Sequence, residues 1–209
     1  TSDLTPVGQI LNYAFVEVDE DWKEVSRCVG DIRLSRSQLP SARAILANRI
    51  DVLRHQARTT QTEIKALYNI REYIEKVMDR CKDVVLLVGF NSGKFDLNFL
   101  RTSMIRNGIN PYFGQALVNA DIKYVCSKLA LVNPEFRKKL LVEEGRVSFK
   151  LEGILKALGI LKPNEAQKHN SLDDVRHTIE LARILHQKYK LDVRVYDAYE
   201  ARPFERVNN

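Results

Sequence analysis

Apolar residues gather in short runs along the first part of the chain. Residues 9–19 and 23–34 are both rich in Val, Ile, Tyr and Phe, and the polar segment 19–21 lies between them. Two such runs joined by a short polar connection are typical of a β-hairpin. We therefore predict two antiparallel strands in this region.

A helical period replaces this pattern further along the chain. Between Thr60 and Cys81 the apolar residues recur at helical spacing, which predicts a long amphipathic helix. The next apolar run, VVLLVGF at 84–90, is rich in β-branched residues and fits a strand buried on both faces. Because the polar corner NSGK at 91–94 comes next, we predict a central strand that leads into a functional turn.

The rest of the pattern predicts mainly helices. Residues 35–58 show no steady period, and residues 133–145 are charged, which favours an exposed helix or loop. The expected elements are helices from Phe95 to Gly108, at 121–131, at 148–158 with Gly159 as the C-terminal cap, and from 171 to 189, with a short strand at 116–119. These elements form a mixed sheet flanked by helices, so the fold class is α/β or α+β.

The length of 209 residues suits one domain, which we assign to residues 1–190, with 191–209 as a tail or linker. With 44% hydrophobic and 29% charged residues, the composition excludes collagen-like, mucin-like and fully disordered proteins. The longest apolar run, at 84–90, is far shorter than the ~20 residues that span a bilayer, which excludes an integral membrane protein.

Charge and cysteine content indicate which kind of partner and which cellular compartment we expect. The net charge of +6 favours a polyanionic partner, although many proteins with this charge bind none. Cys28, Cys81 and Cys126 are odd in number, lack CxxC spacing and lie in apolar stretches, so we expect reduced core thiols. These features indicate an intracellular, cytoplasmic protein. The opening TSDLTPVGQ contains no secretion signal, and we expect the natural protein to start upstream of it.

Two groups of polar residues are candidates for chemistry. Asp96 comes after the predicted central strand, and ligands in open α/β sheets bind beyond the carboxyl ends of strands. Taken alone, Asp96 is better explained as an ordinary helix N-terminal aspartate. His169 and Asp174 flank the start of the final helix and suit a general base and an oxygen ligand of a divalent cation. A capping box of Ser171 and Asp174 is the structural alternative.

Taken together, these motifs resemble those of the DEDDh exonuclease superfamily. GFNSGKFDLNFL is similar to its second motif and KHNSLDDV to its third, in which a His precedes an Asp by five positions. The order of the motifs is most similar to the exonuclease I group, which degrades single-stranded DNA from its 3′ end. QILNYAFVEVD resembles the second strand of this family, and LPSARAILANRI resembles a loop that touches the 3′-terminal nucleotide.

The resemblance implies a fold and a set of roles. The expected fold is ribonuclease H-like, a mixed five-stranded sheet flanked by helices, with the first strand missing from this chain. By resemblance, Asp96 and Asp174 are metal ligands and His169 is the general base. The metals are two Mg²⁺ or Mn²⁺ ions, about 4 Å apart, that activate water and stabilise the leaving 3′ oxygen. The residues assigned to nucleic-acid binding are Ala47, Asn48, Ile50, Asn91 and Phe149.

The first motif of the family, an Asp-x-Glu on the first strand, is absent from the sequence. The opening of the chain resembles the segment directly after this motif in relatives, so we expect the motif directly before Thr1. Asp3 has no partner Glu at the right spacing, and we expect Glu17 and Asp19 at a solvated end of the hairpin.

The resemblance therefore implies a metal-dependent 3′–5′ exonuclease that releases 5′-mononucleotides from single-stranded DNA. One alternative is a degenerate nuclease fold that binds nucleic acid or protein without cutting. Another is an exonuclease that trims RNA or proofreads.

Overall fold

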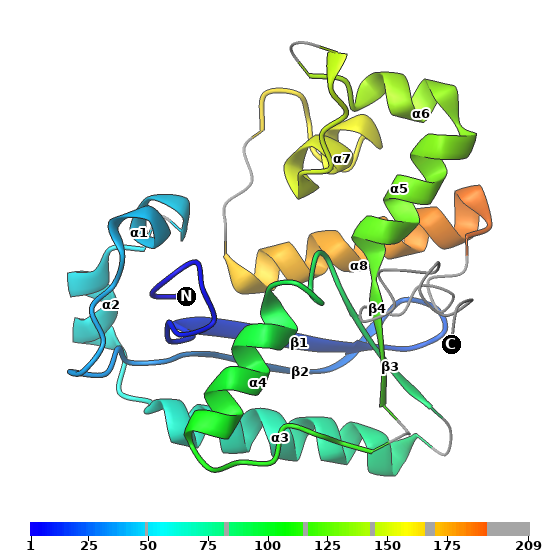
Figure 1. Ribbon diagram of the computed structural model, residues 1–209. Helices are drawn as coiled ribbons and strands as arrows, with labels where there is room; N and C mark the ends of the chain where they lie inside the picture. Colours follow the sequence, from blue (N-terminus) through cyan, green and yellow to red (C-terminus); the bar gives the residue numbers. More distant parts are fainter. Residues whose placement is uncertain (49, 82–83, 115–116, 143–144, 166–169, 192–209) are drawn as a thin grey trace, which may run out of the picture. The chain divides into compact units, whose positions relative to one another are not determined.

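The computed structural model describes residues 1–48, 50–81, 84–114, 117–142, 145–165 and 170–191. In these residues the strands are β1 (Asn12–Val18), β2 (Glu24–Asp31), β3 (Val85–Gly89) and β4 (Leu117–Asp121). The helices are α1 (Ala42–Asn48), α2 (Val52–Arg58), α3 (Glu63–Arg80), α4 (Asp96–Arg106), α5 (Ile122–Val132), α6 (Pro134–Lys139), α7 (Leu151–Ala157) and α8 (Ser171–Tyr189) (Figure 1). The predicted tail at 192–209 lies outside the described residues.

The chain divides into two compact units. The first contains residues 1–85, 94–118 and 169–175, and the second contains residues 86–93, 119–168 and 176–209. The predicted hairpin is confirmed in the first unit, where β1 and β2 pair antiparallel with Phe15 opposite Cys28. The turn between them closes on Asp19, whose side chain accepts a hydrogen bond from the Lys23 amide at 2.9 Å.

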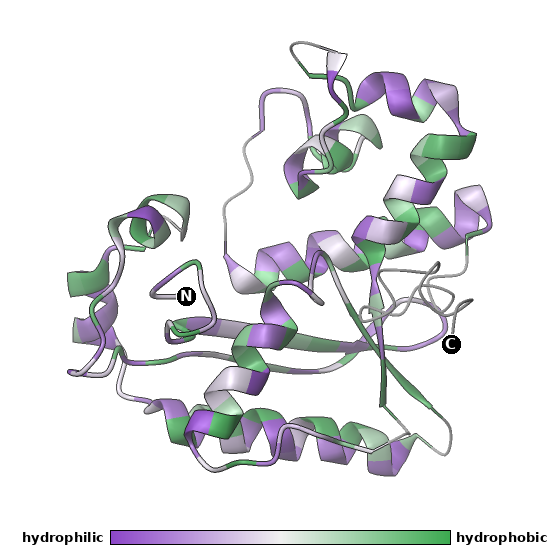
Figure 2. Cartoon of the chain, in the orientation of Figure 1, coloured by the Kyte–Doolittle hydropathy of each residue, from purple (hydrophilic) through white to green (hydrophobic). Residues whose placement is uncertain are grey.

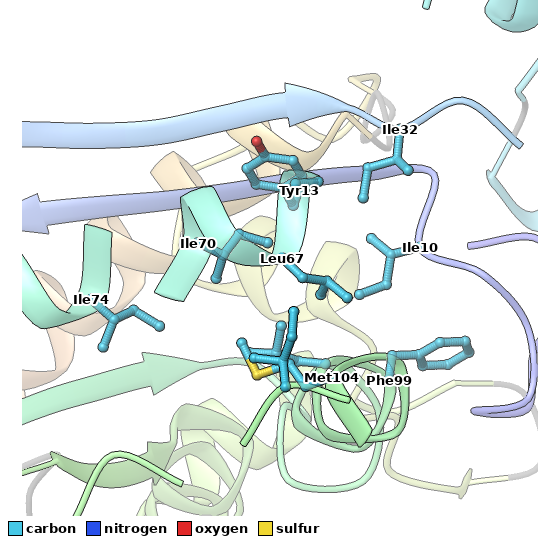
Figure 3. Packing of buried hydrophobic residues seen from close by; sticks show 11 residues of the cluster. Ile10, Tyr13, Ile32, Leu67, Ile70, Ile74, Phe99 and Met104 are labelled. Carbon is cyan, nitrogen blue, oxygen red and sulfur yellow. The ribbon is translucent and has the colours of Figure 1, made fainter. Parts of the chain in front are cut away.

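The predicted long helix is also confirmed, as α3. One face of α3 carries Leu67, Ile70 and Ile74, while charged residues cover the other face (Figure 2). The buried face packs against β2 and α4. Figure 3 shows the resulting core, in which the α3 side chains meet Tyr13 from β1 and Met104 from α4.

In the segment after β2, glutamine side chains make backbone hydrogen bonds of the kind that a neighbouring strand makes. The Gln56 amide accepts a hydrogen bond from the Leu34 N–H and donates one to the Leu34 carbonyl, both at 2.9 Å. The buried side chain of Gln9 donates a hydrogen bond to the Arg33 carbonyl and accepts one from the Ser35 N–H, both at 2.8 Å. The glutamine side chains therefore satisfy four of the six backbone polar groups at 33–35, and the backbone of Gln61 and Gln38 satisfies the other two.

The strand predicted at 84–90 exists as β3, but its predicted burial on both faces is wrong. All five β3 residues are half-buried, although Figure 2 shows how apolar the strand is. The reason is that the described strands form two separate two-stranded sheets, β1 with β2 and β3 with β4. Within the described residues there is thus no continuous five-stranded sheet to cover β3.

Other boundaries agree closely with the predictions. The final helix α8 has the predicted bounds, and α4 ends just before Gly108, which has the expected left-handed φ of 69°. Gly159 likewise has a φ of 77° after α7. Two predictions fail: residues 35–58, where no element was predicted, contain α1 and α2, and Cys81, expected in the core, is exposed. No helix in the described ranges is both long and apolar enough to cross a lipid bilayer.

Candidate functional site

Asp96 is the first residue of α4 and is exposed to solvent. The preceding residue, Phe95, makes no side-chain cap, but its ring packs on Phe99 with the centroids 4.7 Å apart and thereby anchors the start of the helix in the core. The charge of the Asp96 carboxylate acts on the backbone nitrogen of Thr1, so the two residues lie within electrostatic range of each other in the first unit.

Asp174 lies in the first turn of α8, which begins at Ser171. The side chain that caps this helix is Asn170, whose Oδ1 accepts the Leu172 N–H at 3.0 Å. The predicted capping box, with Ser171 as the cap, is therefore wrong, because Ser171 is already inside the helix. Asn170 caps better because its side-chain oxygen reaches the second N–H of the helix. Asp174 belongs to the same unit as Asp96, and His169 lies outside the described residues.

The polar corner between β3 and α4 is a tight turn. Asn91 has a left-handed φ of 59°, a conformation that asparagine tolerates better than most residues. Gly89 approaches Ser92 so closely that a Cβ on Gly89 would lie 2.4 Å from the Ser92 Cβ. The corner NSGK, predicted as a functional turn, thus has one specific backbone path that a larger residue at 89 would disrupt.

Asp121 holds this corner from the second strand of the same sheet. Its carboxylate accepts the backbone N–H groups of Asn91 at 2.7 Å, Lys123 at 3.0 Å and Gly93 at 3.4 Å. The Lys123 ammonium donates to the Asn91 Oδ1 at 3.1 Å. Burial raises the pKa of Asp121, and the hydrogen bonds from Asn91, Lys123 and Gly93 oppose the rise. All of these residues belong to the second unit.

The sequence did not single out Asp121 or Lys123 for a role. Asp121 was predicted only as the start of a helix, and the structure confirms that it is the N-cap of α5. A polar capping residue at the end of a strand was the available signal. Its contact with a corner thirty positions earlier in the chain depends on the pairing of β3 with β4, which no local pattern reveals.

The residues assigned to nucleic-acid binding fall into different parts of the chain. Ala47 is exposed near the end of α1, and Ile50 is half-buried after it; both belong to the first unit, as does the backbone of Asn48. Asn91 and half-buried Phe149 belong to the second unit. Hydrogen bonds join Asn91 to Asp121 and Lys123.

Three other acidic residues have structural roles. Asp3 accepts the N–H groups of Leu4 and Thr5 at 2.6 and 3.0 Å, which closes a turn and lowers the pKa of the carboxyl. Glu17 was expected at a solvated end of the hairpin, which is wrong: its side chain is only 15% exposed and pairs with Arg80. A hydroxyl hydrogen bond from Ser26 at 2.5 Å holds it further. Asp19 is exposed, as expected.

The donor chemistry of the described residues suits a hard cation, but the number of donors is small. The carboxylates of Asp96 and Asp174 are ligands that Mg²⁺ and Mn²⁺ accept. Across the described ranges, no three His, Cys, Asp or Glu side chains are grouped so that they could hold a metal ion. The two aspartates therefore account for only part of the expected metal site.

Comparison with known proteins supports the fold. No family model and no curated protein matches the chain. Solved structures do match. E. coli exonuclease I in complex with a dT13 oligonucleotide has a TM-score of 0.75 and 22% identity over 91% of this chain. Its complex with a dA16 oligonucleotide has a TM-score of 0.73 and 21% identity over 90% of this chain. A zinc-bound complex of E. coli exonuclease I with single-stranded DNA has a TM-score of 0.72 and 20% identity over 91% of this chain.

These matches cover 39–40% of the exonuclease I chains, so this chain spans well under half of their length. At such low identity the likeness concerns the fold. The chain therefore has the mixed α/β fold found in one part of exonuclease I.

Proposed function

We propose that this chain carries the catalytic fold of a metal-dependent 3′–5′ exonuclease that hydrolyses single-stranded DNA to 5′-mononucleotides. The observation that carries the proposal is the likeness of 91% of the chain to exonuclease I in complex with dT13. The position of Asp96, just beyond the end of β3, supports it, because α/β folds bind ligands beyond the ends of strands. The charge of +6 suits a polyanionic substrate.

In this proposal the carboxylates of Asp96 and Asp174 hold Mg²⁺ or Mn²⁺. When bound, two such ions lower the pKa of a water molecule and stabilise charge on the scissile phosphate. His169 accepts the proton of the attacking water, since a histidine with an ordinary pKa of ~6.5 is neutral at physiological pH. The residues that contact the 3′ end of the strand are Ala47, Asn48, Ile50, Asn91 and Phe149.

Further carboxylates are needed to complete the metal site. The resemblance places an Asp-x-Glu pair directly before Thr1, and Thr1 lies within electrostatic range of Asp96. A pair that entered at this point would add its carboxylates beside the one already there. The residues that the gene encodes before Thr1 test this directly: an Asp-x-Glu supports the proposal, and its absence contradicts it.

The activity is tested with a 5′-labelled single-stranded DNA oligonucleotide and Mn²⁺, using the chain both as printed and with its encoded upstream residues. We expect a ladder of shortened products that still carry the label. His169→Ala should lose this ladder, since a positioned general base contributes about 10²- to 10⁴-fold. The control is His186→Ala, which changes an exposed residue in the last turn of α8. Equal loss in both variants would contradict the role of His169.

An RNA oligonucleotide of the same sequence separates the alternative substrates. A groove that selects DNA excludes the 2′-hydroxyl, so RNA should remain uncut. Cleavage of RNA at the same rate would replace the DNA-specific proposal with a general or RNA-directed exonuclease.

One observation favours a second function, a module that binds nucleic acid or protein without cutting. It is that the described residues hold no group of three metal-binding side chains. This function predicts that fluorescence anisotropy detects binding of single-stranded DNA, while no product forms at any concentration of Mn²⁺. A ladder that His169→Ala abolishes would exclude it.

A further inference from the structure

The proposed reaction leaves the most enclosed carboxylate of the described chain without a role. Asp121 is 1% exposed, and it is the only charged residue among the described ones that is fully buried. Its two oxygens are engaged by N–H groups of the corner and of α5. A cap for α5 requires only the Lys123 N–H, so capping alone does not explain why the side chain also binds Asn91 and Gly93.

The two bonds to the corner fix the backbone where it is least regular. Asn91 has a left-handed φ, and its N–H makes the shortest of the three bonds, at 2.7 Å. A carboxylate that accepts several N–H groups in a buried place makes stronger bonds than a neutral acceptor does. Asp121 thus stabilises a conformation that the corner would otherwise adopt at a cost.

Lys123 fixes the side chain of the same residue. Its ammonium bonds the Asn91 Oδ1, and the oxygen and nitrogen of a planar amide diverge from the carbon that they share. The amide nitrogen of Asn91, the hydrogen-bond donor, is therefore directed away from Lys123. Asp121 and Lys123, at the start of α5, thus fix the backbone and the side-chain amide of Asn91.

We propose that Asp121 and Lys123 are positioning residues that hold the Asn91–Gly93 corner in the one geometry the site uses. Asp121 sets the backbone path from which the chain continues to Asp96. Lys123 directs the Asn91 amide nitrogen toward an acceptor on the substrate, such as a phosphate oxygen. The inference rests on the proposed function, because it assigns Asn91 and Asp96 to the same reaction.

The test compares Asp121→Ala with Asp121→Asn in the active protein. Alanine removes every acceptor, whereas asparagine keeps one oxygen for the Asn91 N–H. The control is Asn133→Ala, which removes the cap of α6, a hydrogen bond to the Phe136 N–H at 2.9 Å, within the same unit. Amide hydrogen exchange at Asn91 and Gly93, measured by NMR, reports whether the corner keeps its conformation. Steady-state kinetics on the oligonucleotide report whether this conformation contributes to the reaction.

We expect exchange at Asn91 to rise at least about tenfold in Asp121→Ala and to return near the wild-type rate in Asp121→Asn. We expect kcat to fall about 10- to 100-fold in the alanine variant, as when a supporting residue behind a ligand is lost, with a smaller change in KM. The asparagine variant should recover most of kcat. Asn133→Ala should change neither quantity.

Unchanged exchange at Asn91 in Asp121→Ala would overturn the inference. Faster exchange with an unchanged kcat would also overturn it, because the corner would then not serve the reaction. A wild-type protein that cuts no substrate would instead overturn the proposed function. The exchange data would still show whether Asp121 holds the corner.

Discussion

Asp96 and Asp121 occupy matching places in the chain, yet they have opposite surroundings. Each stands at the start of a helix that comes after a strand of the same two-stranded sheet, Asp96 after β3 and Asp121 at the end of β4. Asp96 is exposed and lies in a helix start that no side chain caps. Asp121 is buried, caps its own helix and binds the corner that precedes Asp96.

The difference shows that position after a strand does not by itself make an aspartate a site residue. A ligand of a metal ion must keep its oxygens accessible, whereas Asp121 has used its oxygens on backbone N–H groups. The exposed carboxylate of Asp96 is therefore suited to bind a ligand. The buried carboxylate of Asp121 is suited to stabilise the corner. Three experiments can sharpen or break this division.

The largest effect is expected for Asp96→Asn. An amide is a poorer ligand for a divalent cation than a carboxylate, so nuclease activity should fall by at least about 100-fold. The free energy of unfolding should change by less than about 0.5 kcal/mol, because the residue is exposed. Activity is measured on the labelled oligonucleotide and stability by urea denaturation. Retained activity, or a large loss of stability, would remove the distinction between the two aspartates.

A smaller effect is expected for Gly89→Ala, which disturbs the corner without touching either aspartate. The new Cβ would lie 2.4 Å from the Ser92 Cβ, so the turn must shift at a cost of about 1–3 kcal/mol. The control is Gly153→Ala in α7, where a Cβ meets no atom within 4 Å and should stabilise the helix by about 0.5–1 kcal/mol. The free energy of unfolding of both variants is measured by chemical denaturation. A change of the same sign in both variants would show that the corner adapts freely to the new Cβ.

The smallest effect is a difference in pH dependence. The pKa of Asp121 is raised by burial above the ~3.9 of an unfolded chain, so ionising this carboxyl costs more in the folded chain, and the free energy of unfolding decreases as the pH rises from ~3.9 through the folded-state pKa. The stability of the wild type relative to Asp121→Asn should therefore fall as the pH is raised from about 3.5 into the neutral range. Thermal unfolding across this range measures it.

Asp3 provides a control of opposite sign. Its pKa is lowered by the hydrogen bond from the Thr5 N–H, so its contribution is present above ~3.9 and lost as the pH falls. The stability of the wild type relative to Asp3→Asn should rise over the same interval. Two parallel pH profiles would contradict the separate surroundings of the two carboxyl groups.

Much of the fold could be predicted because its elements carry strong local patterns. The hairpin of β1 and β2, the amphipathic α3 and the bounds of α8 are evident from periodicity and turn residues. Helices α1 and α2 could not be predicted in this way. His55 and Gln56 of α2 bond the backbone at 32–34, so a contact between distant segments stabilises a short helix whose own pattern is weak.

The candidate site divides in the same way. A motif places Asp96 and Asp174 each beside a helix start, and the structure confirms these two positions, while their roles stay predictions. The cap at Asn170 was missed because Ser171 fits the capping pattern equally well. Lys123 was missed because its bond to Asn91 joins two turns that are distant in the sequence.

The glutamine pair beside the segment after β2 has a consequence for how this protein behaves in a crowded solution. An extended chain with open N–H and C=O groups is a template onto which another molecule can add a strand, and so begin an aggregate. At 33–35 the amides of Gln9 and Gln56 already occupy four of the six backbone groups in the manner of a strand partner, and backbone bonds to Gln38 and Gln61 occupy the other two. The two side chains thus protect this part of the chain against unwanted association.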